Sequence, residues 1–320
     1  MNKITYIIIT LFTISFGIQS CGKTAGEQAK DSTALSIAIL ANKDNLPFYY
    51  ADSMGIYKEL GLNVEFYNYG ASMDCDTAFV NREVDGVVDD IIKANIWHSN
   101  GDSIKVVMSG DLCLYLLTSR SARIKQITSL KEKIIAVTRN SSVDYVADLI
   151  MDSAKLSRLT LNRPQINDIS LRSNMLNLNQ YDGALMSEPY ATYSEMFGAN
   201  RILSSDELCG NLSAVIFHTN TINERRDDIQ KLIKGYNIAV ERLNKMVDDG
   251  NVNILTYLPT TIGEELPDSM LTFKHFSYAS MPTKTIVRQT FSWAKERKLT
   301  KKDTVNYNDL VDSTFYKAHK

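Results

Sequence analysis

Residues 35–90 decide the fold, and their sequence is LSIAILANKDNLPFYYADSMGIYKELGLNVEFYNYGASMDCDTAFVNREVDGVVDD. Three runs of mostly apolar residues predict β-strands, at positions 35–40, 64–69 and 84–88. The segments between them predict one helix over 47–60 and another that begins after a loop at 70–74. Parallel strands joined in this β-α-β-α-β order bind ligands in the crevice beyond their carboxyl ends. The stretch therefore predicts a binding cleft lined by the loops that follow the strands.

The composition is that of a folded protein without a strong charge. The chain has 320 residues, of which 44% are hydrophobic and 22% are charged, and its formal net charge is -2. This length is enough for two domains of ordinary size. A nearly neutral chain has no basic surface field that would attract nucleic acid, so no nucleic-acid partner is expected.

The N-terminal residues resemble a bacterial lipoprotein signal. Lys3 gives a positive start, and residues 4–14 form an apolar run that is too short for a comfortable membrane span. Residues 18–21, IQSC, resemble a lipoprotein box, except that Gln19 stands where a small residue is usual. The resemblance implies cleavage before Cys21 and attachment of lipid to its sulfur. The alternative is an ordinary secretory signal that is cleaved nearby.

The lipoprotein interpretation also predicts where the protein resides. Residues 1–20 are then a lipoprotein signal peptide, and residues 21–33, which lack bulky apolar side chains, are a flexible tether. The protein is expected in the bacterial cell envelope, lipid-anchored to a membrane at Cys21 and facing the periplasm. No second apolar run in the sequence is long enough to cross a bilayer.

Three cysteines follow Cys21, namely Cys75, Cys113 and Cys209, and an odd number cannot all pair. The apolar neighbours of Cys113 and Cys209 indicate free thiols that behave as small hydrophobic groups. A disulfide between these two is the alternative in an oxidising envelope. No metal site is expected, because there is no CxxC pair and the four histidines are scattered.

A second αβ unit is predicted between about residue 120 and about residue 208. It begins with a strand at 133–137, a polar loop, and a helix over 143–154 with Ser141 or Ser142 as its N-cap. It continues with a strand near Ile169, a helix at 173–179 and a strand at 181–186. Residues 111–119 predict a long strand that leads into this unit, and residues 212–219 predict a strand that leads out of it.

Two αβ units joined by two long strands predict two lobes and a hinge. The first lobe is expected to contain residues 34–118 and 213–320, and the second residues 119–212. The hinge is expected at the strands near 116–120 and 208–214.

Residues 46–66, LPFYYADSMGIYKELGLNVEF, are similar to the opening of the SsuA/THI5-like (NMT1-like) group of ABC-transporter solute-binding proteins. The positions that fit the pattern of that group are Gly55, Tyr57, Lys58, Gly61, Leu62, Val64 and Glu65. Residues 187–191, SEPYA, resemble a Glu-Pro segment in the second lobe of the group. The resemblance implies an α/β, two-lobed type II periplasmic-binding-protein fold with a two-strand hinge. Members take sulfonates, nitrate-like anions or pyrimidine precursors, so the resemblance implies a class of protein and no particular ligand.

Five loops at strand ends supply the predicted ligand-binding residues. In the first loop, Asn42 and Asn45 offer amide groups to a ligand. Phe48 either stacks on a planar ligand or packs the first helix against the sheet. In the second loop, Ser72 and Met73 lie at a helix N-terminus, whose N–H groups attract an anion or a carbonyl oxygen. The alternative for Ser72 is an ordinary N-cap.

The third loop contributes Asp89 and Asp90. Neighbouring residues of a strand point to opposite faces, so at most one of the two acids is expected to line the cleft. There it would hold an amine or N–H group of the ligand. The alternative is an N-cap for the helix that starts at Ile91.

The fourth loop contributes Arg139, Asn140 and Ser141. Arg139 either makes a bidentate contact with a carboxylate, sulfonate or phosphate, or is a solvated surface residue. The fifth loop contributes Glu188 and Tyr190. Glu188 accepts a hydrogen bond from a ligand amine, pairs with Arg139 across the empty cleft, or bonds to backbone and positions the lobe.

Acids and an arginine together favour a zwitterionic or heterocyclic nitrogen ligand over a bare oxyanion. The predicted function is the substrate-binding lipoprotein of an ABC importer. It captures a small polar, heterocyclic or organic-anion solute between its lobes and delivers it to a membrane permease. The protein is expected to act as a monomer, without a cofactor and without catalytic residues.

Two alternative functions remain at this point. Type II binding-protein folds also host enzymes of cofactor-precursor or pyrimidine metabolism, and a fold does not settle function. The sequence argues against an enzyme, because it contains no P-loop, no GxGxxG and no cysteine-rich motif of the pyrimidine-forming relatives. The other alternative is a sensor lipoprotein that has lost transport. Permease and ATPase genes beside this one would favour transport over sensing.

Overall fold

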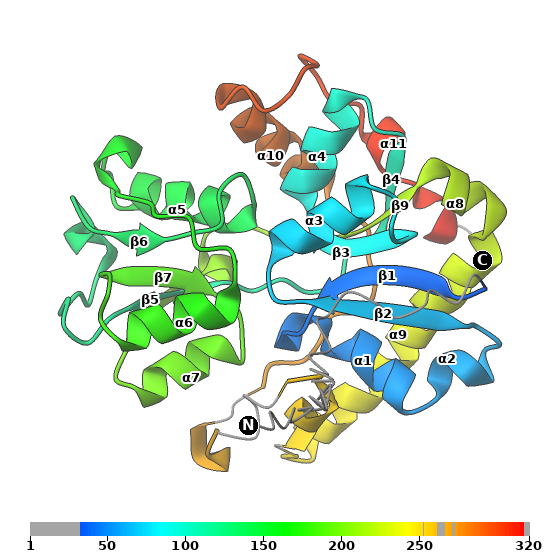
Figure 1. The fold of residues 1–320 in the computed structure, drawn as a ribbon, viewed down its shortest axis with the longest axis horizontal. Helices are drawn as coiled ribbons and strands as arrows, with labels where there is room; N and C mark the ends of the chain where they lie inside the picture. Colours follow the sequence, from blue (N-terminus) through cyan, green and yellow to red (C-terminus); the bar gives the residue numbers. More distant parts are fainter. Residues whose placement is uncertain (1–32, 252, 261–265, 271–272, 317–320) are drawn as a thin grey trace, which may run out of the picture. The chain divides into compact units, whose positions relative to one another are not determined.

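Two β-sheets form the framework of the computed structural model, which describes residues 33–251, 253–260, 266–270 and 273–316 (Figure 1). The predicted signal peptide, the predicted lipid site at Cys21 and all of the predicted tether except Thr33 lie outside these residues. The segment Thr33–Lys320 forms one compact unit that contains both sheets.

The first sheet has five strands in the order β2-β1-β3-β9-β4. Their bounds are Leu35–Leu40 for β1, Val64–Tyr69 for β2, Gly86–Asp90 for β3, Ile104–Met108 for β4 and Ser213–His218 for β9. β1 lies parallel to β2 and β3, whereas β9 lies antiparallel to β3 and β4. The predicted β-α-β-α-β start is therefore confirmed, although β3 extends to include Asp89 and Asp90.

Helices cover both faces of the first sheet (Figure 1). They are α1 (Leu46–Ser53), α2 (Ile56–Glu59), α3 (Ser72–Val80), α4 (Ile91–Asn100), α8 (Thr219–Glu224), α9 (Arg226–Asp248), α10 (Lys284–Glu296) and α11 (Tyr307–Leu310). Side chains alternate along β1, so that Ile37 and Ile39 pack in the cluster with α1 and α9, and Ala38 packs in the cluster with α3 and α4. The predicted helix over 47–60 is interrupted at Gly55, whose φ of 70° is left-handed.

The second sheet has four strands in the order β6-β7-β5-β8. Their bounds are Tyr115–Thr118 for β5, Ile135–Ala136 for β6, Gly183–Met186 for β7 and Asn200–Ser204 for β8. Its helices are α5 (Ser142–Ser153), α6 (Ile169–Asn177) and α7 (Tyr190–Met196). A strand near Ile169 was expected, but α6 begins there because the Asp168 side chain accepts from Leu171 N at 2.7 Å and caps the helix.

Two connections join the sheets, one between β4 and β5 and the other between β8 and β9. The long strand expected over 111–119 is wrong in extent, since only Tyr115–Thr118 is a strand. The two connections are bonded to each other, because Ser205 N donates to Leu114 O at 2.7 Å and Asn211 Nδ2 donates to Gly110 O. The α/β two-sheet fold that was predicted is thus the observed one, with irregular connections that lie side by side.

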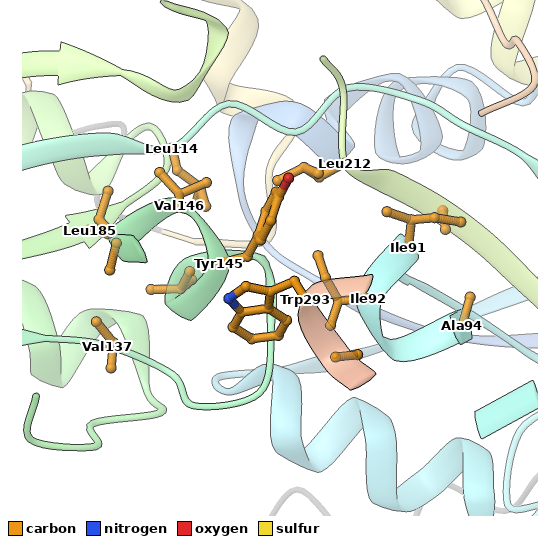
Figure 2. Close-up of a cluster of buried hydrophobic side chains, with 14 of the residues drawn as sticks. Ile91, Ile92, Ala94, Leu114, Val137, Tyr145, Val146, Leu185, Leu212 and Trp293 are labelled. Atoms are coloured by element: carbon orange, nitrogen blue, oxygen red, sulfur yellow. The ribbon is translucent and has the colours of Figure 1, made fainter. Parts of the chain in front are cut away.

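One cluster of buried apolar side chains continues from the first sheet to the second. Figure 2 shows Ile91 and Ile92 of α4, Trp293 of α10 and Tyr145 of α5 within it. The rings of Tyr145 and Trp293 meet edge to face, with centroids 5.6 Å apart. No helix in the described part of the chain has the length and apolar content needed to span a membrane.

Candidate functional site

A small cavity lies where the strand ends of the first sheet face the second sheet. Its walls include the loop after β1, the start of α3 and the end of β3, and opposite them the start of α5, α6 and the end of β7. The volume of this cavity is about 70 Å³. Such a volume holds about five water molecules.

The cavity includes half of the predicted ligand-binding residues. The six that line it are Asn42, Asn45, Ser72, Asp89, Asp90 and Ser141. The six that do not line it are Phe48, Met73, Arg139, Asn140, Glu188 and Tyr190. Contact of the six lining residues with a ligand stays a prediction.

The loop after β1 is held by its own two asparagines. Asn42 Oδ1 accepts from Asn45 N at 3.1 Å, and Asn45 Nδ2 donates to Leu40 O at 3.0 Å. Both side chains are buried at the cavity wall. They fix the loop shape, in which one of the two residues between them presents its carboxylate to the cavity.

That residue, Asp44, was not among the predicted site residues. It lines the cavity, is 4% exposed, and its Oδ2 accepts from Cys113 N at 3.1 Å. Burial raises the pKa of Asp44 to about 7, although the neighbouring Lys43 charge works in the opposite direction. An acid between two capping asparagines at a strand end was the sequence signal for it.

Asp90 joins the two sides of the cavity. Its Oδ1 caps α4 by accepting from Ile92 N at 2.9 Å and Lys93 N at 3.0 Å. Its Oδ2 accepts from Ser142 N, the first residue of α5, at 2.7 Å. The N-cap alternative therefore describes Asp90, and the same carboxylate occupies the positive end of a second helix.

Asp89 belongs to a buried acidic pair. Asp89 Oδ2 and Asp76 Oδ1 are both buried without a hydrogen-bond partner among the described residues. Burial and the neighbouring Asp76 carboxylate raise the pKa of Asp89 well above its usual value. Asp76 Oδ2 pairs with Lys93 Nζ at 2.5 Å. Asp89 and Asp90 both line the cavity, so the expectation that only one would do so is wrong.

The start of α5 contributes serines but not the predicted arginine. Ser141 is the N-cap, accepting from Val143 N at 3.2 Å and donating to Thr138 O at 2.7 Å. Arg139 is exposed and donates to Arg163 O at 2.9 Å, and Asn140 is exposed with a left-handed φ of 57°. Asn140 has this left-handed conformation just before the N-cap Ser141, and the side chains of Arg139 and Asn140 are both exposed outside the cavity lining. The ligand role predicted for Arg139 and Asn140 therefore has to be corrected.

Arg172 on α6 supplies the cation of the cavity instead. It is 3% exposed and is the one lysine or arginine among the lining residues. Its guanidinium donates to Ile166 O at 2.9 Å, Leu185 O at 2.7 Å and Thr138 Oγ1 at 2.6 Å. Burial lowers the pKa of Arg172 to about 10, which leaves it charged near neutral pH. The sequence offered no signal for it, because the segment was predicted to start as a strand.

Glu188 and Tyr190 lie outside the cavity lining for identifiable reasons. Glu188 accepts from Arg201 Nη2 at 2.7 Å and from Thr192 N at 2.9 Å. Its cationic partner is therefore Arg201 of β8 and not Arg139. Tyr190 is 8% exposed and belongs to the apolar cluster of the second sheet.

Phe48 and Met73 also require correction. Phe48 is 1% exposed, and its ring packs against Tyr236 of α9 with centroids 4.7 Å apart, so it stabilises the core. Met73 is 45% exposed, with its sulfur 3.3 Å from Asn167 Nδ2. Ser72 is the first residue of α3, and the N-cap is Ala71, which has no side-chain cap bond.

The three described cysteines, Cys75, Cys113 and Cys209, are free, so the disulfide alternative is wrong. Burial raises the pKa of Cys113 to about 12 and that of Cys209 to about 11, which keeps both thiols protonated at neutral pH. Within the described ranges, no histidine, cysteine or carboxylate side chains gather into a set able to hold a metal ion.

Solved structures contain the same arrangement of sheets over nearly the whole chain. The alkanesulfonate-binding protein SsuA from Xanthomonas axonopodis pv. citri, bound to MOPS, matches with a TM-score of 0.71 at 14% identity, covering 89% of this chain and 100% of that one. The periplasmic nitrate-binding protein NrtA from Synechocystis PCC 6803 matches with a TM-score of 0.75 at 10% identity, covering 90% and 88%.

The chain has the periplasmic-binding-protein fold. A further similar structure is the ligand-binding component of an ABC-type import system from Staphylococcus aureus with zinc bound, at a TM-score of 0.69 and 15% identity, covering 89% of this chain and 98% of that one. No family model matches the sequence, and no curated protein matches it. At these identities the similarity establishes the fold, and the predicted SsuA-like architecture is confirmed at that level.

Proposed function

We propose that this protein is the solute-binding component of an ABC importer. The cavity carries the proposal, because its walls combine residues that follow strands of both sheets. A solute held there contacts both sides at once. Similar structures support the same conclusion, because they include the ligand-binding component of an ABC-type import system and binding proteins for alkanesulfonate and nitrate. A volume of about 70 Å³ lined by acids, amides and an arginine suits a small polar solute.

Binding acts by bridging two lobes. We assign residues 34–118 and 213–320 to one lobe and residues 119–212 to the other. Lys43 N donates to Glu188 O at 2.8 Å, and Ser142 N donates to Asp90 Oδ2 at 2.7 Å, so both bonds cross between these lobes. A solute that contacts both sides adds interactions only in this closed arrangement and shifts the population toward it. The closed form then docks on a membrane permease.

The cell envelope is the proposed location. Signal peptide 1–20 directs export, and Cys21 carries a lipid that anchors the chain through residues 21–33. Cys21→Ser should abolish incorporation of labelled fatty acid and release the protein into the soluble fraction. Unchanged labelling of this variant would overturn the anchor and leave the solute-binding proposal intact.

A binding role is proposed over an enzymatic one. The lining residues include serines and acids but neither histidine nor cysteine, so no serine or cysteine nucleophile is paired there with an imidazole base. The buried histidine His218 lies outside the cavity lining, with its Nε2 2.9 Å from Phe79 O and its ring stacked on the Phe79 ring. Solute capture needs no such base.

The test is a ligand screen of the soluble chain, residues 23–320. Thermal unfolding and native mass spectrometry would be recorded with sulfonates, nitrate, amino acids and pyrimidines. The proposal expects one class to raise the unfolding temperature and to appear bound at one molecule per chain, unchanged in mass. Chemical conversion of the bound compound, or no stabilisation by any class, would overturn it.

A further inference from the structure

Two buried side chains of opposite charge line the same cavity without pairing. Arg172 is 3% exposed and Asp44 is 4% exposed. Neither of them is in an ion pair in the described part of the chain. A buried charge is costly unless another charge or several hydrogen bonds compensate it. Arg172 makes four hydrogen bonds to neutral acceptors and lies in the field of the Asp168 carboxylate, whereas Asp44 accepts one hydrogen bond and lies in the field of Lys43. Neither charge is therefore neutralised by a direct ion pair, and a ligand of opposite charge can supply one.

Arg172 defines the end of the cavity that accepts an anion. Its guanidinium bonds are to carbonyl oxygens and to the Thr138 hydroxyl, all of them neutral acceptors. The start of α3 lies beside it, because Ile169 N donates to Gly70 O at 3.3 Å and Arg172 Nη2 donates to Asn167 O at 3.2 Å. No side chain caps α3, so its first N–H groups add to the positive potential at this end.

The start of α5 does not take part in anion binding. Its first N–H group, that of Ser142, is bonded to the Asp90 carboxylate, and that of Val143 is bonded to Ser141. An anion in the cavity therefore meets Arg172 and the start of α3.

Asp44 defines the end that accepts a cation. The preceding residue, Lys43, has its ammonium group 4.9 Å from the centroid of the Phe276 ring and forms no ion pair with the carboxylate. Asp111 also lines the cavity and adds negative charge on this side, where its Oδ2 accepts from Ser277 N at 2.9 Å. A ligand ammonium group is the counter-charge that this end lacks.

We propose that the cavity binds a small zwitterion, with its acidic group at Arg172 and the start of α3 and its ammonium group at Asp44. The inference rests on the proposed function and names the class of solute. Arg172 and Asp44 extend from opposite walls, α6 and the loop after β1, and do not neutralise each other. A bridging zwitterion neutralises both. The volume of about 70 Å³ limits it to about six non-hydrogen atoms.

The experiment is calorimetric titration of residues 23–320 at pH 8, where Asp44, with a pKa of about 7, is ionised. The zwitterions are glycine, 3-aminopropanoate, 4-aminobutanoate and 2-aminoethanesulfonate. Propanoate and propylamine are the matched compounds with one charge. At least one zwitterion is expected to bind about 30-fold or more tightly than both. Equal binding of propanoate or propylamine, or no binding of any zwitterion, would overturn the proposal.

Substitutions of Asp44 and Arg172 test which charged group of the ligand each end of the cavity binds. Asp44→Asn should remove the advantage of the zwitterion over propanoate and leave propanoate binding unchanged. Arg172→Lys should weaken zwitterion and propanoate alike and leave propylamine unchanged, with circular dichroism to verify folding. Arg139→Ala, exposed and outside the cavity lining, is the matched control and should change none of these affinities. A zwitterion advantage that survives Asp44→Asn contradicts the assignment.

The ligand screen separates this inference from the proposed function. A tight hit by nitrate or an uncharged pyrimidine, with no zwitterion bound, keeps the solute-binding role and overturns the zwitterion. A screen in which no compound of any class binds overturns both.

Discussion

Arg297, immediately after α10, donates from Nη2 to Oδ2 of Asp148 in α5 at 2.5 Å. α10 packs on α4 of the first sheet, and α5 packs on the second sheet. Asp148 has 0% exposure and also accepts from Trp293 Nε1 at 2.7 Å and Arg163 Nη2 at 2.5 Å. This buried carboxylate is therefore a second connection between the sheets, separate from the cavity.

Arg297→Ala should lower the free energy of unfolding by about 1–3 kcal/mol at pH 7, because its charged hydrogen bonds to Asp148 and Asp144 are lost while Arg163 still bonds both carboxylates. Burial alone would raise the pKa of Asp148, but Arg297, Trp293 and Arg163 hold it below its usual 3.8. A carboxylate with a lowered pKa stabilises the fold above pH 3.8, and that stabilisation is lost as the pH falls below it.

Urea unfolding at pH 7 and near pH 3 checks this prediction. The difference between wild type and Arg297→Ala should shrink at the lower pH. Lys295→Ala is the control, because its partner Asp303 is 91% exposed and such pairs contribute little. An equal loss in both variants would contradict the special role of Asp148.

Asp44 should make the protein less stable as the pH rises. The Asp44 carboxyl group loses its proton near pH 3.8 in the unfolded chain and near pH 7 in the folded chain. Between these pH values the folded state therefore binds one proton more than the unfolded state. Its contribution is complete below 3.8 and is lost as the pH rises through 7. The Lys43 charge lowers the pKa of Asp44, whereas the Asp111 and Glu188 charges raise it.

Asp44→Asn removes this dependence. The variant should match wild type near pH 4 and exceed its free energy of unfolding at pH 8 by up to about 4 kcal/mol. Thermal or urea unfolding across this range measures the difference. Parallel pH profiles for the two proteins would show that Asp44 titrates normally.

Glu188→Gln should affect stability more than solute affinity. The substitution removes a charged bond to Arg201, which then keeps Glu195 at 2.7 Å, so a loss of about 1–2 kcal/mol is expected. The Glu188 carbonyl still accepts from Lys43 N. Affinity for the solute found by the screen should stay within about twofold, measured by calorimetry. A tenfold loss of solute affinity would indicate that Glu188 contributes to the binding site.

Gly86→Ala should destabilise the first sheet. A Cβ atom at Gly86 would lie 2.4 Å from the Phe217 ring of β9, which is 0% exposed and has no room to move. A loss of about 1–3 kcal/mol is expected in urea unfolding. Gly210→Ala is the matched control, because nothing lies within 4 Å of its Cβ position. Equal stability of the two variants would contradict the close packing of β3 on β9.

The sequence predicted features that depend on local patterns. The strand at 35–40 and the cap at Ser141 follow from apolar periodicity and helix-start residues, and both are observed. Arg172 could not be found in this way, because its burial depends on carbonyl groups of distant segments such as Leu185. Phe48 is similar: the ring of Tyr236, far along the chain, determines which face of α1 is covered.

Pairing partners were the least predictable feature. Sequence alone offered Arg139 as one possible partner of Glu188, across the empty cleft. The actual partner, Arg201, lies on β8, and its guanidinium also stacks over the Tyr115 ring of β5 at 4.1 Å. Only the order of the strands within the second sheet brings these groups together.

The position of β9 has a consequence for synthesis of the chain. Of the described strands, only β9 pairs with β4, and it also covers the outer edge of β3. Until residues 213–218 leave the ribosome, β4 has no neighbour and the β3 edge is open to pairing with other chains. Nascent chains that stop within the middle third should therefore aggregate through this open edge unless a chaperone holds them, and synthesis of β9 closes the edge.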